Sequence, residues 1–301
     1  MKKDFYDHIA ENKAKSFLIL FLFSLFIIFL GYIFGIYFFG SWISGAVIAF
    51  VIAIIYCLFA YFAGDSAVLS LNKAKKIAKK DDPYLWNTVE GLSIAAGLPM
   101  PAVYLVKEDS ANAFATGRDP KHASIAVTTG LRDKMNREEL EGVLAHEMSH
   151  VGNYDVRYMI LVAMLVGVIA IMSDFMLRSF FFGGVRRDEK GGGNIIIIVI
   201  AILLAILAPL IAQLMKLSLS RKREFLADAT AAKLTRNPHG LASALKKIKN
   251  DTDKVVDTAN KGMAHLYIEN PLRHKENKSW IDTMFSTHPP IDERIKRLEE
   301  M

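Results

Sequence analysis

Residues 136–151 read NREELEGVLAHEMSHV, and this stretch decides what kind of fold the chain can form. Asn136 followed three residues later by Glu139 is the pattern of a capping box, which begins a helix. Within the predicted helix, His146 and His150 lie four residues apart, so both imidazoles project from the same face. Two histidines at this spacing can bind one zinc ion.

Other acidic residues complete the predicted metal site. Glu147 follows the first histidine, where its carboxylate can act as a general base without binding the metal. A catalytic zinc needs a third protein ligand and a position open to water. The segment EFLAD at 224–228 supplies Glu224 and Asp228 one turn apart on a predicted helix. We assign Glu224 as the third ligand of one zinc ion per chain, and Asp228 as the acceptor that holds a ligand histidine.

The composition indicates a membrane protein. Of the 301 residues, 52% are hydrophobic and the mean hydropathy is +0.25, which is too apolar for soluble domains alone. The net charge of +6 suits an anionic membrane surface, and no interleaved basic and aromatic pattern indicates nucleic acid. Cys57 is the single cysteine, which excludes an intrachain disulfide framework and a cysteine-rich metal site.

The apolar residues form blocks long enough to span a bilayer. Residues 16–64 carry no charge and predict two helices of about 20 residues. The turn between them is expected at one of the glycines 31, 35, 40 and 45. Two further apolar blocks, 158–177 and 191–215, predict a second hairpin, although charged residues interrupt the end of its first helix. Whether this second hairpin crosses the whole bilayer stays open.

The basic residues predict the orientation in the membrane. Lysines flank the first hairpin on both sides, at positions 2, 3, 13, 15, 73, 75, 76, 79 and 80. By the positive-inside rule both flanks face the cytoplasm, so we expect a multi-pass protein of the cell (inner) membrane with its catalytic domain on the cytoplasmic side.

The polar segments predict one domain interrupted by the second hairpin. We expect residues 1–64 to form the N-terminal hairpin, 158–215 the second hairpin, and 65–157 with 216–301 the catalytic domain. Short apolar segments bounded by Gly, Pro and Asp predict strands of a small sheet at 101–107, 111–116 and 123–128. The predicted fold is therefore an integral membrane protein, mainly α-helical with a small β-sheet.

The order of these segments resembles the HtpX-type membrane metalloproteases, which are relatives of the CAAX prenyl proteases and of a mitochondrial inner-membrane protease. The resemblance is carried by NAFATG at 112–117, AHEMSHVGNYD at 145–155, REFLAD at 223–228 and THPPIDERI at 287–295. It implies a zincin-like metalloprotease domain with two transmembrane hairpins. It also implies His146, His150 and Glu224 as zinc ligands and Glu147 as the base.

The resemblance implies further roles that spacing alone does not. His288 would stabilise the oxyanion and Arg294 would support the site, although composition alone makes His288 a turn residue. An extended substrate would add to the edge strand that contains Asn112, Ala113 and Phe114. For Asp155 two interpretations remain, orientation of a ligand histidine or capping of a helix end.

The resemblance implies an endopeptidase that cleaves unfolded or damaged membrane proteins in quality control. Processing of a specific C-terminal or prenylated peptide is an alternative, as is a non-catalytic membrane adaptor with a structural zinc. A transporter is disfavoured because the ionisable residues cluster outside the apolar blocks. The oligomeric state stays open.

Overall fold

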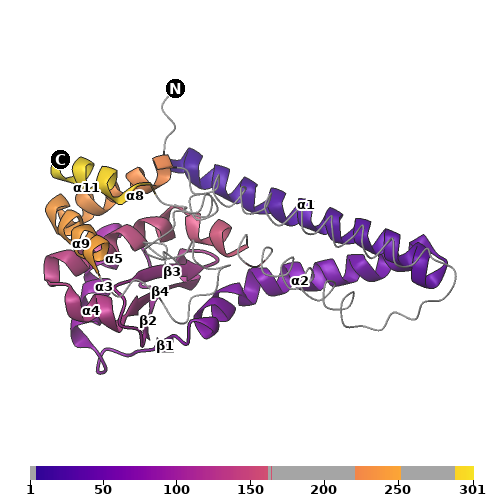
Figure 1. Cartoon of the computed structure of the whole chain (residues 1–301), viewed down its shortest axis with the longest axis horizontal. Coiled ribbons are helices and arrows are strands. Elements are labelled where there is room, and N and C mark those ends of the chain that lie inside the picture. Colours follow the sequence, from indigo (N-terminus) through magenta and orange to yellow (C-terminus); the bar gives the residue numbers. More distant parts are fainter. Residues whose placement is uncertain (1–4, 162–163, 165–220, 252–288) are drawn as a thin grey trace.

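Two long helices project from a smaller mixed α/β part in the computed structural model (Figure 1). Helices α1 (Phe5–Phe39) and α2 (Trp42–Leu71) pack against each other as a hairpin. The structure describes residues 5–161, 164, 221–251 and 289–301. Most of the predicted second hairpin and residue 288 lie outside these ranges.

The turn of the hairpin lies at Gly40, whose φ of +62° is a left-handed conformation that glycine adopts without strain. The Ser41 side chain then caps α2 by accepting a hydrogen bond from the backbone N–H of Ser44. The other three expected turn glycines lie inside the helices instead. A Cβ at Gly45 would lie 2.2 Å from the carbonyl oxygen of Gly31, so these glycines let the two helices touch.

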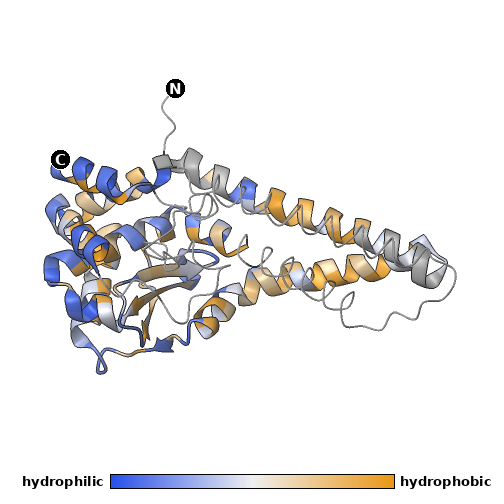
Figure 2. Ribbon diagram, viewed as in Figure 1, coloured by the Kyte–Doolittle hydropathy of each residue, from blue (hydrophilic) through white to orange (hydrophobic). Residues whose placement is uncertain are grey.

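The outer surface of the hairpin is apolar (Figure 2). Large side chains along α2 face outward, including Ile43 at 56% exposure and Ile55 at 62%. Among the described residues, α2 is the one helix that is long and apolar enough to cross a membrane. It also continues past Gly64 to Leu71, beyond the predicted end of the hairpin.

The sheet is small and mixed. Its strand order is β1-β2-β4-β3, in which β2 and β4 are parallel and the other two pairs are antiparallel. The strands are β1 (Lys75–Lys76), β2 (Ala102–Val106), β3 (Ala113–Gly117) and β4 (Ala123–Thr128). The three predicted strands are confirmed, with β3 shifted by about two residues at its start. The dilysine β1 was not predicted because two charged residues carry no strand pattern.

Helix α5 (Arg137–Gly152) lies at the centre of the mixed part and packs against β3 and three other helices. The predicted capping box between Asn136 and Glu139 is confirmed. The other described helices of this part are α3 (Pro83–Ala96), the 3-10 helix η1 (Pro120–His122), the short α4 (Thr129–Lys134), α8 (Arg221–Thr235), α9 (Pro238–Asn250) and α11 (Ile291–Glu299). A mainly helical fold with a small sheet is thus confirmed.

The hydrophobic core packs around most of α5, from Leu140 to Val151. Val143 and Leu144 of the helix are fully buried, as are Ile125 and Val127 of β4 and Leu245 of α9. Burial of most of this helix brings polar residues into the interior as well. Because buried polar groups must be paired, their partners have to come from the neighbouring elements.

Candidate metal centre

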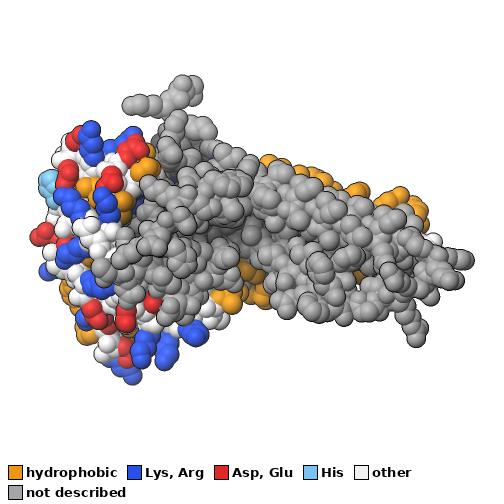
Figure 3. All heavy atoms as spheres, in the orientation of Figure 1, with side chains coloured by type: hydrophobic (Ala, Val, Ile, Leu, Met, Phe, Trp, Pro, Cys, Tyr) orange, Lys and Arg blue, Asp and Glu red, His pale blue; other side chains and the backbone are white. Residues whose placement is uncertain are grey.

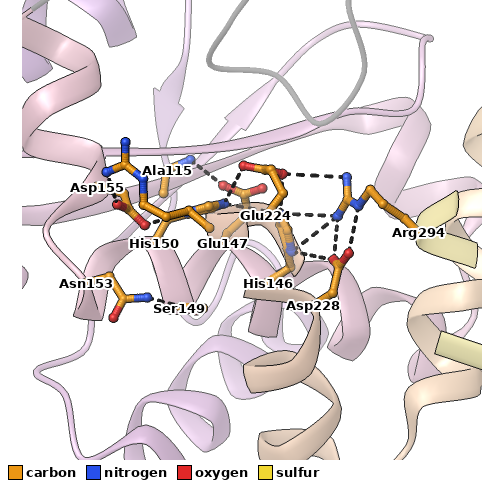
Figure 4. A network of polar contacts seen from close by, with 11 residues as sticks. Ala115, His146, Glu147, Ser149, His150, Asn153, Asp155, Glu224, Asp228 and Arg294 are labelled. Atoms are coloured by element: carbon orange, nitrogen blue, oxygen red, sulfur yellow. Dashed lines mark hydrogen bonds and ion pairs between the residues drawn. The ribbon is translucent and has the colours of Figure 1, made fainter. Parts of the chain in front are cut away.

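Three side chains from two helices converge in the interior (Figure 4). His146 and His150 project from α5, and Glu224 projects from the first turn of α8. Their ligand atoms lie within 4.8 Å of one another, and the residues are 1%, 3% and 0% exposed. The structure therefore brings together the three residues that the sequence assigned as zinc ligands.

The distances between these donor atoms fit one tetrahedral zinc ion. The Nε2 atoms of His146 and His150 lie 3.2 Å apart. The Glu224 oxygens lie 3.6 Å from His146 Nε2 and 3.5 Å from His150 Nε2. Atoms bound about 2.0–2.1 Å from a tetrahedral zinc are separated by roughly 3.3–3.4 Å, close to these three values.

Carboxylates hold the opposite nitrogen of each histidine. His146 Nδ1 lies 2.9 Å from Asp228 Oδ1, and His150 Nδ1 lies 3.1 Å from Asp155 Oδ2. An ionised carboxylate only accepts hydrogen bonds, so each Nδ1 carries the proton and donates it. Each Nε2 then faces Glu224 and would offer its lone pair to a metal that displaces a proton from it. Asp155 is thus in contact with a histidine, and the residue that caps the end of α5 is Asn153.

Two arginines hold these carboxylates in turn. Arg294 of α11 donates from Nε to Asp228 Oδ2 at 2.9 Å and from NH2 to Asp228 Oδ1 at 2.6 Å. It is 1% exposed and also lies 3.8 Å from Glu224. Arg223 donates to Asp155 Oδ1 at 2.9 Å. The family resemblance had implied that Arg294 supports the site, whereas the contact of Arg223 had no signal beyond its position before Glu224.

The charges of the centre also fit a divalent cation. Glu147, Glu224, Asp228 and Asp155 are all at most 5% exposed, and they face the guanidiniums of Arg294 and Arg223. With neutral histidines, four carboxylates and two guanidiniums leave an excess of two negative charges. Buried charge of this size requires compensation, which one divalent ion would provide.

Proton binding would compete with a metal at this site. Burial and the charge of Arg294 lower the pKa of His146, but the carboxylates of Asp228 and Glu224 outweigh them and raise this pKa to about 9. For Asp228, burial raises the pKa, but Arg294 and His146 together lower it to about 2. Asp228 is therefore ionised at neutral pH, and a cation that binds His146 displaces a proton.

Glu147 connects α5 with the edge strand. Its Oε2 accepts a hydrogen bond of 2.9 Å from the backbone N–H of Ala115 in β3. Glu147 is 5% exposed and lies beside the histidines without belonging to the three-residue cluster. Sequence reasoning could not find this contact, because a backbone N–H has no signature in the sequence.

The predicted substrate strand also lies at the centre. The strand β3, which contains Ala113 and Phe114, is at the edge of the sheet, and Asn112 immediately precedes it. These three residues are at most 4% exposed. The hydroxyl of Thr128 in β4 accepts a hydrogen bond from the backbone N–H of Asn112 and donates one to the backbone carbonyl oxygen of Asn112. These two bonds hold the start of the strand in register. His288 lies outside the described residues.

The fold and the site together define a metalloprotease: a buried helix with two histidines and a glutamate, a third carboxylate from a second helix, and an edge strand beside them. The model of peptidase family M48 matches residues 79–301. The chain belongs to this family. The resemblance to HtpX-type membrane metalloproteases is confirmed as well, and proteins of family M48 are in general zinc-dependent.

Several relatives match along nearly their whole length. A protein named "Protease HtpX homolog" from Dictyoglomus turgidum is 44% identical over 297 residues, which are 99% of this chain and 95% of the relative. A protein of the same name from Listeria monocytogenes is 43% identical over 98% of this chain and 99% of its own length. The crystal structure of S. mikatae Ste24p has a similar fold, with a TM-score of 0.53 at 19% identity, over 98% of this chain and 67% of Ste24p.

Proposed function

We propose that the chain is a zinc-dependent endopeptidase that cleaves unfolded or damaged membrane proteins at the cytoplasmic face of the membrane. The observation that carries this proposal is the convergence of His146, His150 and Glu224 on one point, with Glu147 beside them. The three would hold the ion and leave a coordination position for a reactant, as catalytic zinc sites do. The quality-control role rests on the resemblance to the HtpX-type relatives.

The residues around the ion would divide the chemistry among them. Zinc, when bound, supplies Lewis-acid chemistry that polarises a carbonyl and acidifies water. Glu147 would take the proton of the attacking water at its carboxylate and pass it to the leaving amine. Its hydrogen bond from Ala115 N–H keeps the carboxylate between the ligand helix and the edge strand. His288 would stabilise the negative charge that develops on the carbonyl oxygen.

The edge strand supports recognition through the backbone. Within the described residues β3 pairs with β4 alone, and an extended peptide would add along the other side of β3 as a further strand. Backbone hydrogen bonds do not depend on side chains, which suits an enzyme that accepts many unfolded sequences. Asn112, Ala113 and Phe114 would form this substrate-binding strand.

The membrane arrangement completes the proposal. Residues 1–64 would form the first hairpin and 158–215 the second, and residues 65–157 with 216–301 would form a single catalytic domain. The exposed apolar surface of α2 supports insertion in a bilayer. Lysines on both flanks of the first hairpin support a cytoplasmic position of the catalytic domain.

A cleavage assay with the full chain in detergent tests this function. The zinc-loaded protein should cleave an unfolded membrane protein at internal bonds, and a chelator should abolish the cleavage. Glu147→Gln should lower the rate by about 10²–10⁴-fold, because the general base is lost, while the zinc content stays unchanged.

Three outcomes of this assay would contradict the proposal. Retained cleavage by Glu147→Gln would remove the general-base role. A zinc-loaded protein that cleaves only a peptide with a prenylated C-terminus would favour specific processing, and one that cleaves nothing would favour an adaptor with a structural zinc. Glu141→Gln, on the outer part of the same helix, is the matched control and should keep full activity.

A further inference from the structure

A second polar site lies where the hairpin meets the catalytic part. A pocket with about 200 Å³ of empty space, its open mouth included, lies between α2, the end of β3 and the helical residues 155–161. Its lining includes the polar or charged side chains of Tyr61, Asp65, Arg118 and Arg157. Inside its mouth there is room for about one water molecule, so a ligand could place a single polar group there and would otherwise lie over the mouth.

Two guanidiniums in this pocket are stacked on aromatic rings of α2. Arg157 lies 5.0 Å from the ring centre of Tyr61, and Arg118 lies 5.3 Å from that of Phe62. Stacking uses the faces of the guanidiniums and leaves their N–H groups available for an acceptor. Both cations are thereby held in place at a site that a ligand can enter.

The arginines are incompletely neutralised by the described residues. The Nε of Arg157 is buried without a hydrogen-bond acceptor, and within the described ranges its guanidinium forms no ion pair. Arg118 has an ion pair of 3.8 Å with Asp119, whose carboxylate also accepts hydrogen bonds from the backbone of η1. A buried donor without a partner costs free energy, so the pair of cations favours binding of an anion.

The pocket lies at the border between apolar and polar sequence. Asp65 is the first charged residue after the uncharged block 16–64, and Arg157 is the last before the apolar block that begins at Tyr158. The two segments also touch, since the hydroxyl of Tyr56 donates to the carbonyl oxygen of Met164 at 2.7 Å. Beside the pocket, Phe62 keeps 55% of its surface exposed. In a membrane this is the level of the lipid headgroups.

We propose that the headgroup of an aminophospholipid binds at the mouth of this pocket. The phosphate would accept hydrogen bonds from Arg157 and Arg118, and the ammonium group would lie against the carboxylate of Asp65. The acyl chains would cover the exposed apolar residues of α2 next to the pocket, including Leu58 and Phe59. Asp65 distinguishes this ligand from a purely anionic lipid, because a carboxylate repels an anion but attracts an amine. This site is separate from the metal centre and does not depend on the proposed protease function.

Native mass spectrometry of the detergent-purified full chain tests the proposal. The measurement counts the bound lipid after addition of phosphatidylethanolamine or phosphatidylglycerol with the same acyl chains. The protein should retain phosphatidylethanolamine in preference, and Arg157→Gln should weaken that binding about 10- to 100-fold. Lys79→Gln, an exposed cation on the catalytic part, should bind as the unchanged protein does. Equal retention by Arg157→Gln and the unchanged protein would overturn the site.

Further variants and a competition experiment test the roles of Asp65 and Arg157 and the source of the phosphate. Asp65→Asn should keep phosphate binding and lose the preference for the amine; an unchanged preference would overturn the role of Asp65. Millimolar inorganic phosphate should not displace the lipid, because it lacks acyl chains; displacement would identify a soluble anion as the ligand instead. If Arg157→Gln lowers the unfolding temperature, Arg157→Lys keeps the charge and serves as the second variant. It should bind more weakly than the unchanged protein, and equal binding would overturn the guanidinium contact.

Discussion

Along α2 the large apolar side chains face outward, with Ile55 62% exposed, whereas in the metal centre the charged side chains face inward, with Glu224 and Arg294 at most 1% exposed. Figure 3 shows the same contrast on one face, where hydrophobic atoms border the hairpin and charged atoms gather on the catalytic part. Lipid tails are as apolar as the side chains of the protein, so burial of apolar surface does not drive two helices together in a bilayer. The hairpin is stabilised instead by close contact between small residues. The metal centre instead pairs Asp228 and Asp155 with arginines and leaves an excess of two negative charges that a divalent cation would balance.

The largest expected effect on stability follows from removal of one buried charge. Arg294→Met leaves Asp228 ionised and buried without its bidentate partner, which should lower the free energy of unfolding by about 3–5 kcal/mol. Thermal unfolding in detergent measures this. Arg137→Met removes an exposed cation of α5 and should barely change the unfolding temperature. Equal effects of the two substitutions would contradict the view that pairing stabilises the centre.

A glycine substitution tests whether close contact between α1 and α2 stabilises the hairpin. Gly45→Ala places a Cβ 2.2 Å from the carbonyl oxygen of Gly31, so α1 and α2 must separate, at a cost of about 1–3 kcal/mol. Gly91→Ala makes the same change in α3, where nothing lies within 4 Å, and should be neutral or stabilising. Opposite shifts of the unfolding temperature are expected. A neutral Gly45→Ala would mean that close helix contact does not hold the hairpin together.

The smallest expected effect comes from a partly exposed ion pair. Asp82 caps α3 and accepts a hydrogen bond of 2.8 Å from Arg132. Burial raises the pKa of Asp82, but Arg132 and the backbone N–H of Leu85 outweigh it, so the folded-state pKa lies below the usual value. Its stabilisation is therefore complete above the unfolded pKa of about 3.9 and is lost as pH falls through the lower folded value.

Asp82→Asn keeps a capping side chain and removes only the charge. The variant should be less stable than the unchanged protein by under about 1 kcal/mol at pH 6, and the difference should shrink as pH falls below about 4. Thermal unfolding across this pH range measures the difference. A difference that grows on acidification would contradict the sign of the pKa shift.

The same comparison explains what the sequence could predict. The two histidines lie four residues apart on one helix, so their spacing alone placed them on one face, with Glu147 next to His146 in the chain. Glu224 followed from the need for a third ligand. The contact of Arg223 with Asp155 joins residues 68 positions apart, and no local pattern encodes it. Nor does the sequence distinguish a glycine that turns the chain, such as Gly40, from one that packs helices together.

Zinc content of the purified chain tests the central claim most directly, namely that α5 and α8 hold one ion between them. Metal analysis should find about one zinc per chain in the unchanged protein and in Glu141→Ala, which alters an outer residue of α5. Glu224→Ala should lose most of the metal, because two histidines alone bind zinc weakly. Full zinc occupancy in Glu224→Ala would contradict the account, since the third ligand would then lie elsewhere.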